Sequence, residues 1–166
     1  MKLRFLSLAL LIAWPVQAEE IPLEWIDPDT GRRVVRLSSE PDTASLYFHQ
    51  DAFTKDGSRA IVVNPRGIAT IDLKTRETRM IVPEVGYRPG TSAGIEVGAV
   101  TGDVYYYKDN TLYAVNPDTL EQRKVIELSP NDRMSDINAD ETLLVGTYTK
   151  PDPDRPKFSS WPRRGR

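Results

Sequence analysis

Two copies of one turn pattern, IDLKTRE at residues 71–77 and VNPDTLE at residues 115–121, decide the fold of this 166-residue chain. Each copy starts at the apolar end of a candidate strand, runs through a polar turn and leads into another candidate strand. The second copy follows the first after 44 positions. A shorter pair, FTKDGSR at residues 53–59 and NADET at residues 138–142, repeats a different turn. Repeats of about 40–45 residues with four strands each are typical of β-propeller blades.

The sequence around these turns consists of short runs of Val, Ile, Tyr and Thr, separated by Asp-Gly, Thr-Gly and Asn-Pro turn signals. These runs predict a hairpin, two sets of four strands and the first half of a third set. The expected strands are residues 24–26 and 33–37; 47–53, 60–64, 68–72 and 78–82; 95–99, 104–108, 111–116 and 122–128; and 134–137 and 143–148. The predicted fold class is all-β, with antiparallel four-stranded blades of an incomplete β-propeller of about two and a half blades. A generic antiparallel meander or sandwich is the alternative.

The two ends of the chain differ from its body. Residues 1–18 combine a basic start, a short apolar run and small residues before Ala18, which predicts a cleaved signal peptide and an exported, periplasmic protein. A retained N-terminal anchor is the alternative; after cleavage no membrane span is expected. Residues 19–149 are expected to be the N-terminal part of a β-propeller. Residues 150–166, rich in proline and arginine, are expected to be a disordered or non-native basic tail.

Charge and cysteine content exclude some function classes. The segment between Glu19 and Thr149 contains 14 basic and 22 acidic side chains, a net charge of −8. Phosphate binding requires a basic surface, so nucleic acid is not expected as a partner. The chain has no cysteine, which excludes disulfides and thiolate metal sites. Because the net charge of this segment is negative, a polyanionic ligand would need a local basic site.

Three segments carry a resemblance to a known family: TGRRVVRL at residues 30–37, YFHQDAFTKDGS at residues 47–58 and NADETLLVGTY at residues 138–148. In this order they resemble the oligogalacturonate lyases and their exported relatives. The similarity runs from about Trp25 to Thr149 and covers about the first third of such a family member. It implies a seven-bladed propeller that cleaves pectin-derived oligogalacturonates by β-elimination with a divalent metal, manganese. The FTxDG element also occurs in TolB-type propellers, so a non-catalytic module that binds a periplasmic protein is the alternative.

The resemblance implies a metal held mainly by histidines and a histidine base, all in later blades. This chain has a single histidine, so no catalytic residue, metal ligand or bound cofactor is assigned to it. We expect the chain alone to be inactive as a lyase. A decayed gene fragment without function is a third possibility.

The candidate substrate-binding residues are Arg66, Arg88 and His49, with a pectic oligosaccharide as the expected partner. Strand alternation over residues 47–53 would place His49 beside Asp51, and local hydrogen bonding of an inner-strand histidine is the alternative. Arg66 and Lys108 are expected in the turns between second and third blade strands, and Arg88 and Arg133 in the connections between blades. Together they would form a basic rim that pairs with uronate carboxylates. Solvated loop charges are the alternative, because the opposite rim carries as many bases.

Two further expectations concern packing. Alternation places Tyr105 and Tyr107 on one face of a strand and Tyr106 on the other, which favours packing between blades over sugar stacking. The incomplete set of blades would also leave strand edges exposed, so self-association is a possible consequence.

Overall fold

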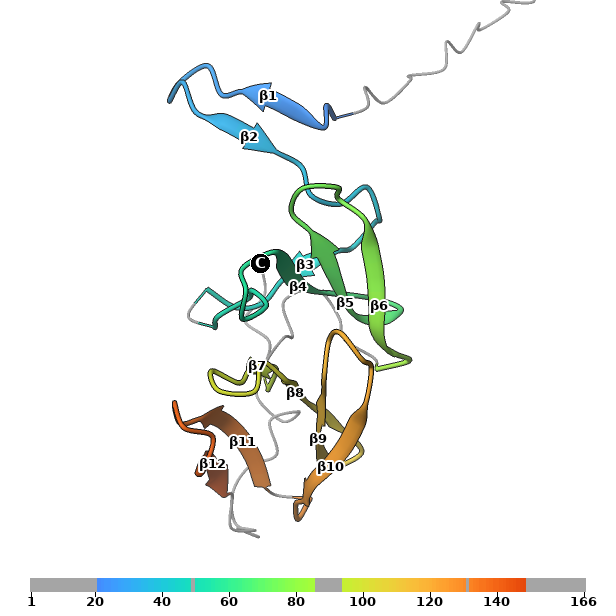
Figure 1. Ribbon diagram of the computed structural model, residues 1–166, viewed down its shortest axis with the longest axis vertical. Coiled ribbons are helices and arrows are strands. Elements are labelled where there is room, and N and C mark those ends of the chain that lie inside the picture. The colour runs from blue at the N-terminus through green and yellow to red at the C-terminus, as the bar shows by residue number, and fades with distance from the viewer. Residues whose placement is uncertain (1–20, 49, 86–93, 131, 149–166) are drawn as a thin grey trace, which may run out of the picture. The chain divides into compact units, whose positions relative to one another are not determined.

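A computed structural model describes residues 21–48, 50–85, 94–130 and 132–148 of the chain. Twelve strands and no helix occur in these residues, and every pairing between neighbouring strands is antiparallel (Figure 1). The chain divides into two compact units, Met1–Arg36 and Leu37–Arg166. The predicted signal peptide, the basic tail, His49 and Arg88 lie outside the described residues.

The first unit contains one hairpin. Strands β1 (Glu24–Ile26) and β2 (Arg33–Val35) pair with Trp25 opposite Val34. The turn forms because the Asp27 carboxylate accepts hydrogen bonds from the backbone N–H of Thr30 at 2.8 Å and from its hydroxyl at 2.6 Å. The predicted hairpin is confirmed, with its second strand two residues shorter than expected.

The second unit contains two four-stranded sheets and a hairpin, each with neighbouring strands in sequence order. The first blade consists of β3 (Ala44–Ser45), β4 (Arg59–Asn64), β5 (Gly67–Asp72) and β6 (Thr78–Pro83). The second blade consists of β7 (Glu96–Val97), β8 (Val104–Lys108), β9 (Thr111–Val115) and β10 (Gln122–Glu127). The remaining hairpin, which begins a third blade and is called the third hairpin below, consists of β11 (Asp132–Ile137) and β12 (Leu144–Tyr148). These are two blades and half of a third, as the repeats predict.

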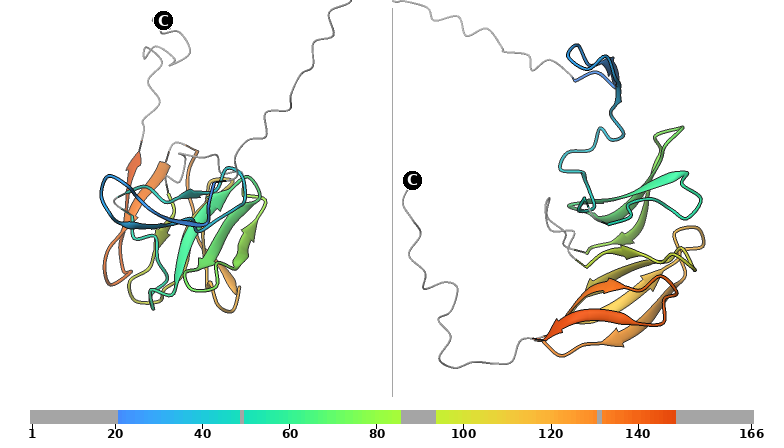
Figure 2. Two further views of the ribbon diagram at one scale, coloured as in Figure 1. Left: turned by 90° about the horizontal axis from the view of Figure 1, so that it is seen from above. Right: turned by 90° about the vertical axis from the view of Figure 1, so that its left-hand side faces the viewer.

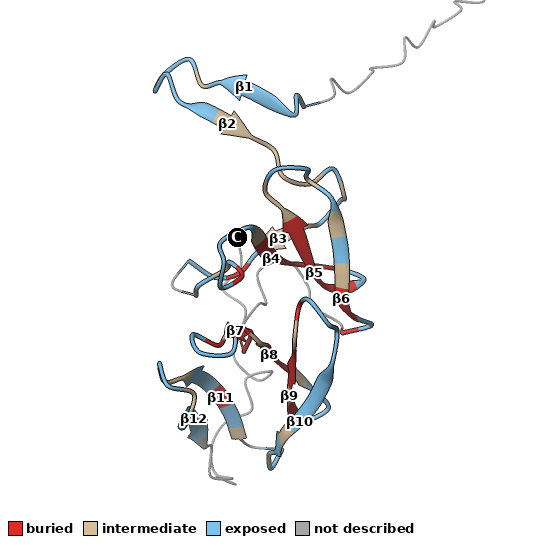
Figure 3. Cartoon of the chain, in the orientation of Figure 1, coloured by how far each residue is buried: buried red, intermediate tan, exposed pale blue. Residues whose placement is uncertain are grey.

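The sheets of the second unit lie against one another (Figure 2), and apolar side chains form layers between them. Figure 3 colours the buried residues of these strands red. One layer joins the first and second blades and includes Ile61, Ile68 and Tyr106. Another includes Tyr105 and Met134 and joins the second blade to the third hairpin, with Tyr107 packed against it. The alternation predicted for the three tyrosines is therefore confirmed. Their faces serve packing between blades.

The prediction of a strand over residues 47–53 is wrong. The innermost strand of the first blade is β3, which ends at Ser45. The backbone N–H of Gln50 donates to the carbonyl of Tyr47 at 2.9 Å, and the Tyr47 N–H donates to Gln50 Oε1 at 2.8 Å. These bonds close a turn where the prediction has an extended chain. The Gln50 amide also donates to the buried Glu96 carboxylate at 2.9 Å, so the turn is tied to the second blade.

Candidate functional site

The same end of each blade carries the turn between its second and third strands and the exit of its fourth strand. In the first blade the Glu84 N–H donates to the carbonyl of Arg66 at 2.8 Å, and in the second the Leu128 N–H donates to that of Asn110 at 2.8 Å. We call this end the exit rim. The expected sharing of one rim by these turns and exits is thus confirmed for both blades.

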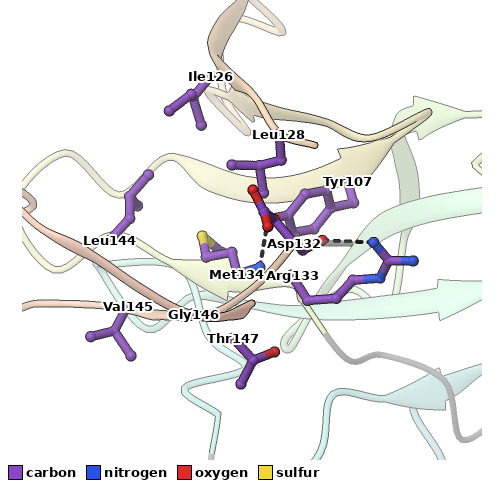
Figure 4. A pocket seen from close by; sticks show the side chains of 10 residues that line it. All are labelled: Tyr107, Ile126, Leu128, Asp132, Arg133, Met134, Leu144, Val145, Gly146 and Thr147. Atoms are coloured by element: carbon purple, nitrogen blue, oxygen red, sulfur yellow. Dashed lines mark hydrogen bonds between the residues drawn. The ribbon is translucent and has the colours of Figure 1, made fainter. Parts of the chain in front are cut away.

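A cavity of about 360 Å³ lies at the exit rim, between the second blade and the third hairpin (Figure 4). The residues lining it are Tyr107, Ile126, Leu128, Asp132, Arg133, Met134, Leu144, Val145, Gly146 and Thr147. One end is polar, where Tyr107 faces the start of β11 at Asp132 and Arg133 (Figure 4). The other end is apolar and is formed by Ile126 and Leu144.

The polar end has spare hydrogen-bonding capacity. The Met134 N–H donates to the Tyr107 hydroxyl oxygen at 2.6 Å, which leaves the hydroxyl hydrogen able to donate elsewhere. Oδ1 of Asp132 is buried without a hydrogen-bond partner among the described residues. Within the described part of the chain, Arg133 donates hydrogen bonds through Nη1 alone, to the carbonyls of Asp132 at 2.6 Å and Pro130 at 3.0 Å. This end therefore offers both donors and an acceptor to a polar ligand.

The Tyr107 hydroxyl is held in its protonated form. Burial raises the pKa of Tyr107, and the charge of Asp132 acts in the same direction. The hydrogen bond from Met134 and the charge of Arg133 oppose this rise without cancelling it. Tyr107 is therefore a neutral hydrogen-bond donor at physiological pH.

A second cavity, of about 390 Å³, lies between the same two sheets and includes Tyr105, Arg123 and Glu141 in its lining. Its central carboxylate, Glu141, accepts four hydrogen bonds: from Val100 N at 2.7 Å and from Thr101 N, Thr101 Oγ1 and Tyr105 Oη at 2.8 Å each. Arg123 donates to the Tyr105 hydroxyl at 3.0 Å. Because these groups satisfy one another, the cluster is a clasp between the third hairpin and the second blade. The cavity at the exit rim therefore has free hydrogen-bonding groups, whereas the groups around Glu141 at the opposite rim are satisfied. This difference distinguishes the two rims, which the number of basic residues on each rim does not.

Glu141 occupies a strained backbone position. Its φ of +58° matches the +70° of Gly57 at the equivalent place in the first blade's turn. We expect Glu141→Ala to lower the free energy of unfolding by about 2 kcal/mol, because charge-assisted hydrogen bonds are lost. Glu141→Gly should lose about 1 kcal/mol less, since glycine relieves the strain. Denaturant unfolding measures both, with the exposed Glu121→Ala as a neutral control; equal losses for Ala and Gly would contradict the strain argument.

The clasp also predicts a pH dependence. Burial raises the pKa of Glu141, but the hydrogen bonds from Thr101, Tyr105 and Val100 outweigh it, so the pKa lies below its ordinary value. A lowered carboxyl pKa contributes stability above the unfolded-state value of about 4.3 and loses it as the pH falls further. The stability difference between the wild type and Glu141→Ala should therefore shrink in acid below about pH 4.

The residues expected from the sequence have mixed placements. Arg66 lies in the β4–β5 turn with an exposed side chain, and its guanidinium donates to the Glu40 carboxylate at 2.6 Å. Its charge is therefore compensated locally. Lys108 ends β8 at the exit rim, as expected. Arg133 lies inside β11 and not in the connection before it, because Asp132 already pairs with Tyr148.

Sequence reasoning missed Tyr107 and Asp132 as site residues. Strand alternation predicts only a packing role for Tyr107, but the same alternation also brings its hydroxyl to the cavity beside the third hairpin. The residues that the structure describes contain no group of three or more His, Asp or Glu side chains able to hold a metal ion. They also contain no helix long and apolar enough to cross a membrane.

Fold and site together define an all-β chain that forms part of a β-propeller. Comparison of the sequence with protein-family models and with curated proteins finds no match. Among solved structures, an oligogalacturonate lyase in complex with manganese is similar, with 27% sequence identity and a TM-score of 0.60. The match covers 74% of this chain and 34% of that protein. The chain thus spans about a third of the length of the lyase that it resembles.

Proposed function

We propose that this chain belongs to an oligogalacturonate-lyase-like propeller and that the polar end of the exit-rim cavity binds a uronate unit of a pectin-derived oligogalacturonate. The similarity to the lyase supports the substrate class. The unused donors of Arg133 carry the proposal, because a guanidinium can bind a carboxylate in a bidentate way.

The remaining groups suit a sugar ring. The Tyr107 hydroxyl and the unpaired Asp132 Oδ1 supply a donor and an acceptor for ring hydroxyls. Met134 and Leu128 supply apolar surface for the C–H groups of the ring. The net charge of −8 between Glu19 and Thr149 opposes a polyanion, so Arg133 provides the local attraction that binding needs.

Arg133→Ala tests this site. We expect it to weaken binding of trigalacturonate at least about tenfold, the loss of a hydrogen bond to a charged group. Isothermal titration calorimetry measures the affinity. Lys74→Ala removes the same charge at the opposite rim, where Lys74 lies in the β5–β6 turn, and should change binding little. Equal losses in both variants would mean that general electrostatics, and not this site, determines binding.

We further propose that the chain alone binds without cleaving. β-Elimination needs a base for the proton α to the carboxylate and a cation for the developing negative charge. The described residues provide no cluster that fits a metal, so no step through manganese is assigned to this chain. The ultraviolet absorbance of unsaturated uronate, followed with and without added Mn²⁺, should stay flat. Clear turnover would overturn this part while leaving the Arg133 test intact.

A further inference from the structure

The turn between β1 and β2 repeats the turns that join the third and fourth strands of both complete blades. In each turn the first side chain accepts a hydrogen bond from the N–H three residues on: Asp27 from Thr30 at 2.8 Å, Asp72 from Thr75 at 2.7 Å, and Asn116 from Thr119 at 3.0 Å. The next residue has a left-handed φ: Gly31 +65°, Arg76 +64° and Leu120 +63°. This hairpin therefore has the geometry of the outer half of a blade.

The third hairpin has the geometry of an inner half. In its turn the Asp140 carboxylate accepts from Thr142 N at 3.2 Å, as Asp56 accepts from Ser58 N at 3.1 Å in the first blade. Strands β11 and β12 thus correspond to the first and second strands of a blade. Among the described residues β1 pairs only with β2, and β12 pairs only with β11. The chain carries two complementary half-blades, each with an open edge.

The equivalences fix how the two halves would pair. In the first blade Ala60 faces Ile71 and Ile61 faces Thr70 across the junction of second and third strands. Since Asp140 matches Asp56, Leu144 is equivalent to Ala60. Since Asp27 matches Asp72, Ile26 is equivalent to Ile71. Leu144 would then face Ile26, and Val145 would face Trp25.

This register joins apolar side chains that are exposed in the structure. Val145 is 63% exposed and Ile26 is also 63% exposed, while Leu144 and Trp25 are 39% and 37% exposed. Pairing would bury all four and saturate both open edges with backbone hydrogen bonds. Pairing would also cover the apolar end of the cavity at Leu144. The polar end at Arg133 would stay uncovered, because Arg133 lies on β11, the innermost strand, away from the junction.

We propose that β12 of one copy of this chain pairs with β1 of a second copy, so that each junction completes a four-stranded blade. Each copy then contributes three blades in total, two whole and two halves. Two copies that pair reciprocally in this way use both open edges of each copy, and two-fold dimers are the commonest closed assemblies. Closed head-to-tail assembly leaves no open edge.

Cysteine cross-linking tests the register, because the chain has no cysteine of its own. Trp25→Cys and Val145→Cys are made as separate variants and mixed under mild oxidation. We expect a disulfide-linked pair of one variant with the other, since directly opposed residues have Cβ atoms close enough. Glu24→Cys mixed with Val145→Cys is the control, because Glu24 points to the opposite face and should not cross-link. Equal cross-linking of both mixtures would overturn the register.

Mass measurement tests the assembly. Light scattering on the purified chain should give twice the monomer mass. Val145→Lys places a charge in the junction and should give a monomer with unchanged β-structure by circular dichroism. Val100→Lys, at a similarly exposed valine in the β7–β8 turn, should remain a dimer. A monomeric wild type, a dimeric Val145→Lys or an open-ended series of masses would each overturn the reciprocal pairing of two copies. None of these readouts depends on sugar binding.

Discussion

Tyr106→Ala is expected to destabilise the protein by about 4 kcal/mol, the range for removing a large aromatic side chain from a packed core. Tyr106 is 1% exposed and lies in the apolar layer between the first and second blades, with its ring 5.7 Å from that of Tyr113. Truncation would leave a cavity between sheets joined mainly by this layer. Chemical denaturation measures the loss.

Tyr106→Phe separates the ring from the hydroxyl. The Tyr106 hydroxyl makes no hydrogen bond with another described residue, so the variant should stay within about 1 kcal/mol of the wild type. Burial, and then the neighbouring Tyr113, raises the pKa of Tyr106 to about 12. A raised tyrosine pKa contributes stability below about pH 10 that disappears as the pH rises toward 12, and Tyr106→Phe should lose less stability there. A small effect of Tyr106→Ala would contradict the layered packing.

Gly67→Ala should prevent folding or cost more than about 3 kcal/mol, because the backbone there cannot accept a side chain. Gly67 opens β5 with a φ of +141°, and an added Cβ would lie 2.0 Å from the carbonyl oxygen of Val82 on β6. Relief would require β5 and β6 to separate at the exit rim. Soluble yield and the thermal transition measure the outcome.

Gly57→Ala is the matched control. Gly57 also has a positive φ, +70°, but an added Cβ would meet nothing within 4 Å. Only the strain of the left-handed backbone remains, about 1 kcal/mol. If both alanines cost the same, the close approach of Val82 does not determine the effect at Gly67.

The repeats made the blades predictable because the signal is local. The side chains of Asp72 and Asn116 accept hydrogen bonds from the backbone two and three positions on, so each turn is determined by neighbouring residues in the sequence. The prediction of a strand over residues 47–53 is wrong because a residue distant in the sequence determines the conformation of that segment. Gln50 binds Glu96, 46 positions away, and the segment turns to make that contact.

The site was harder to predict for the same reason. The exposed position of Arg66 followed from its turn, but its ion pair depends on Glu40, 26 positions earlier. The cavity at Tyr107 exists because β11 packs against β8, and neither strand alone carries a sign of it. The hairpin of Asp27 was predicted, whereas its equivalence to the turns of the blades emerged from the shared φ values and hydrogen bonds.

The Glu141 clasp has a consequence for how stability is distributed along the chain. The third hairpin has two strands, and the layer beneath it is small, so Glu141 and the bond from Met134 to Tyr107 supply much of its attachment. Such a segment opens at a lower free energy than the two blades, as a separate cooperative unit. The amide hydrogens of β11 and β12 would then exchange with solvent by local opening, while those of β4 and β5 wait for global unfolding.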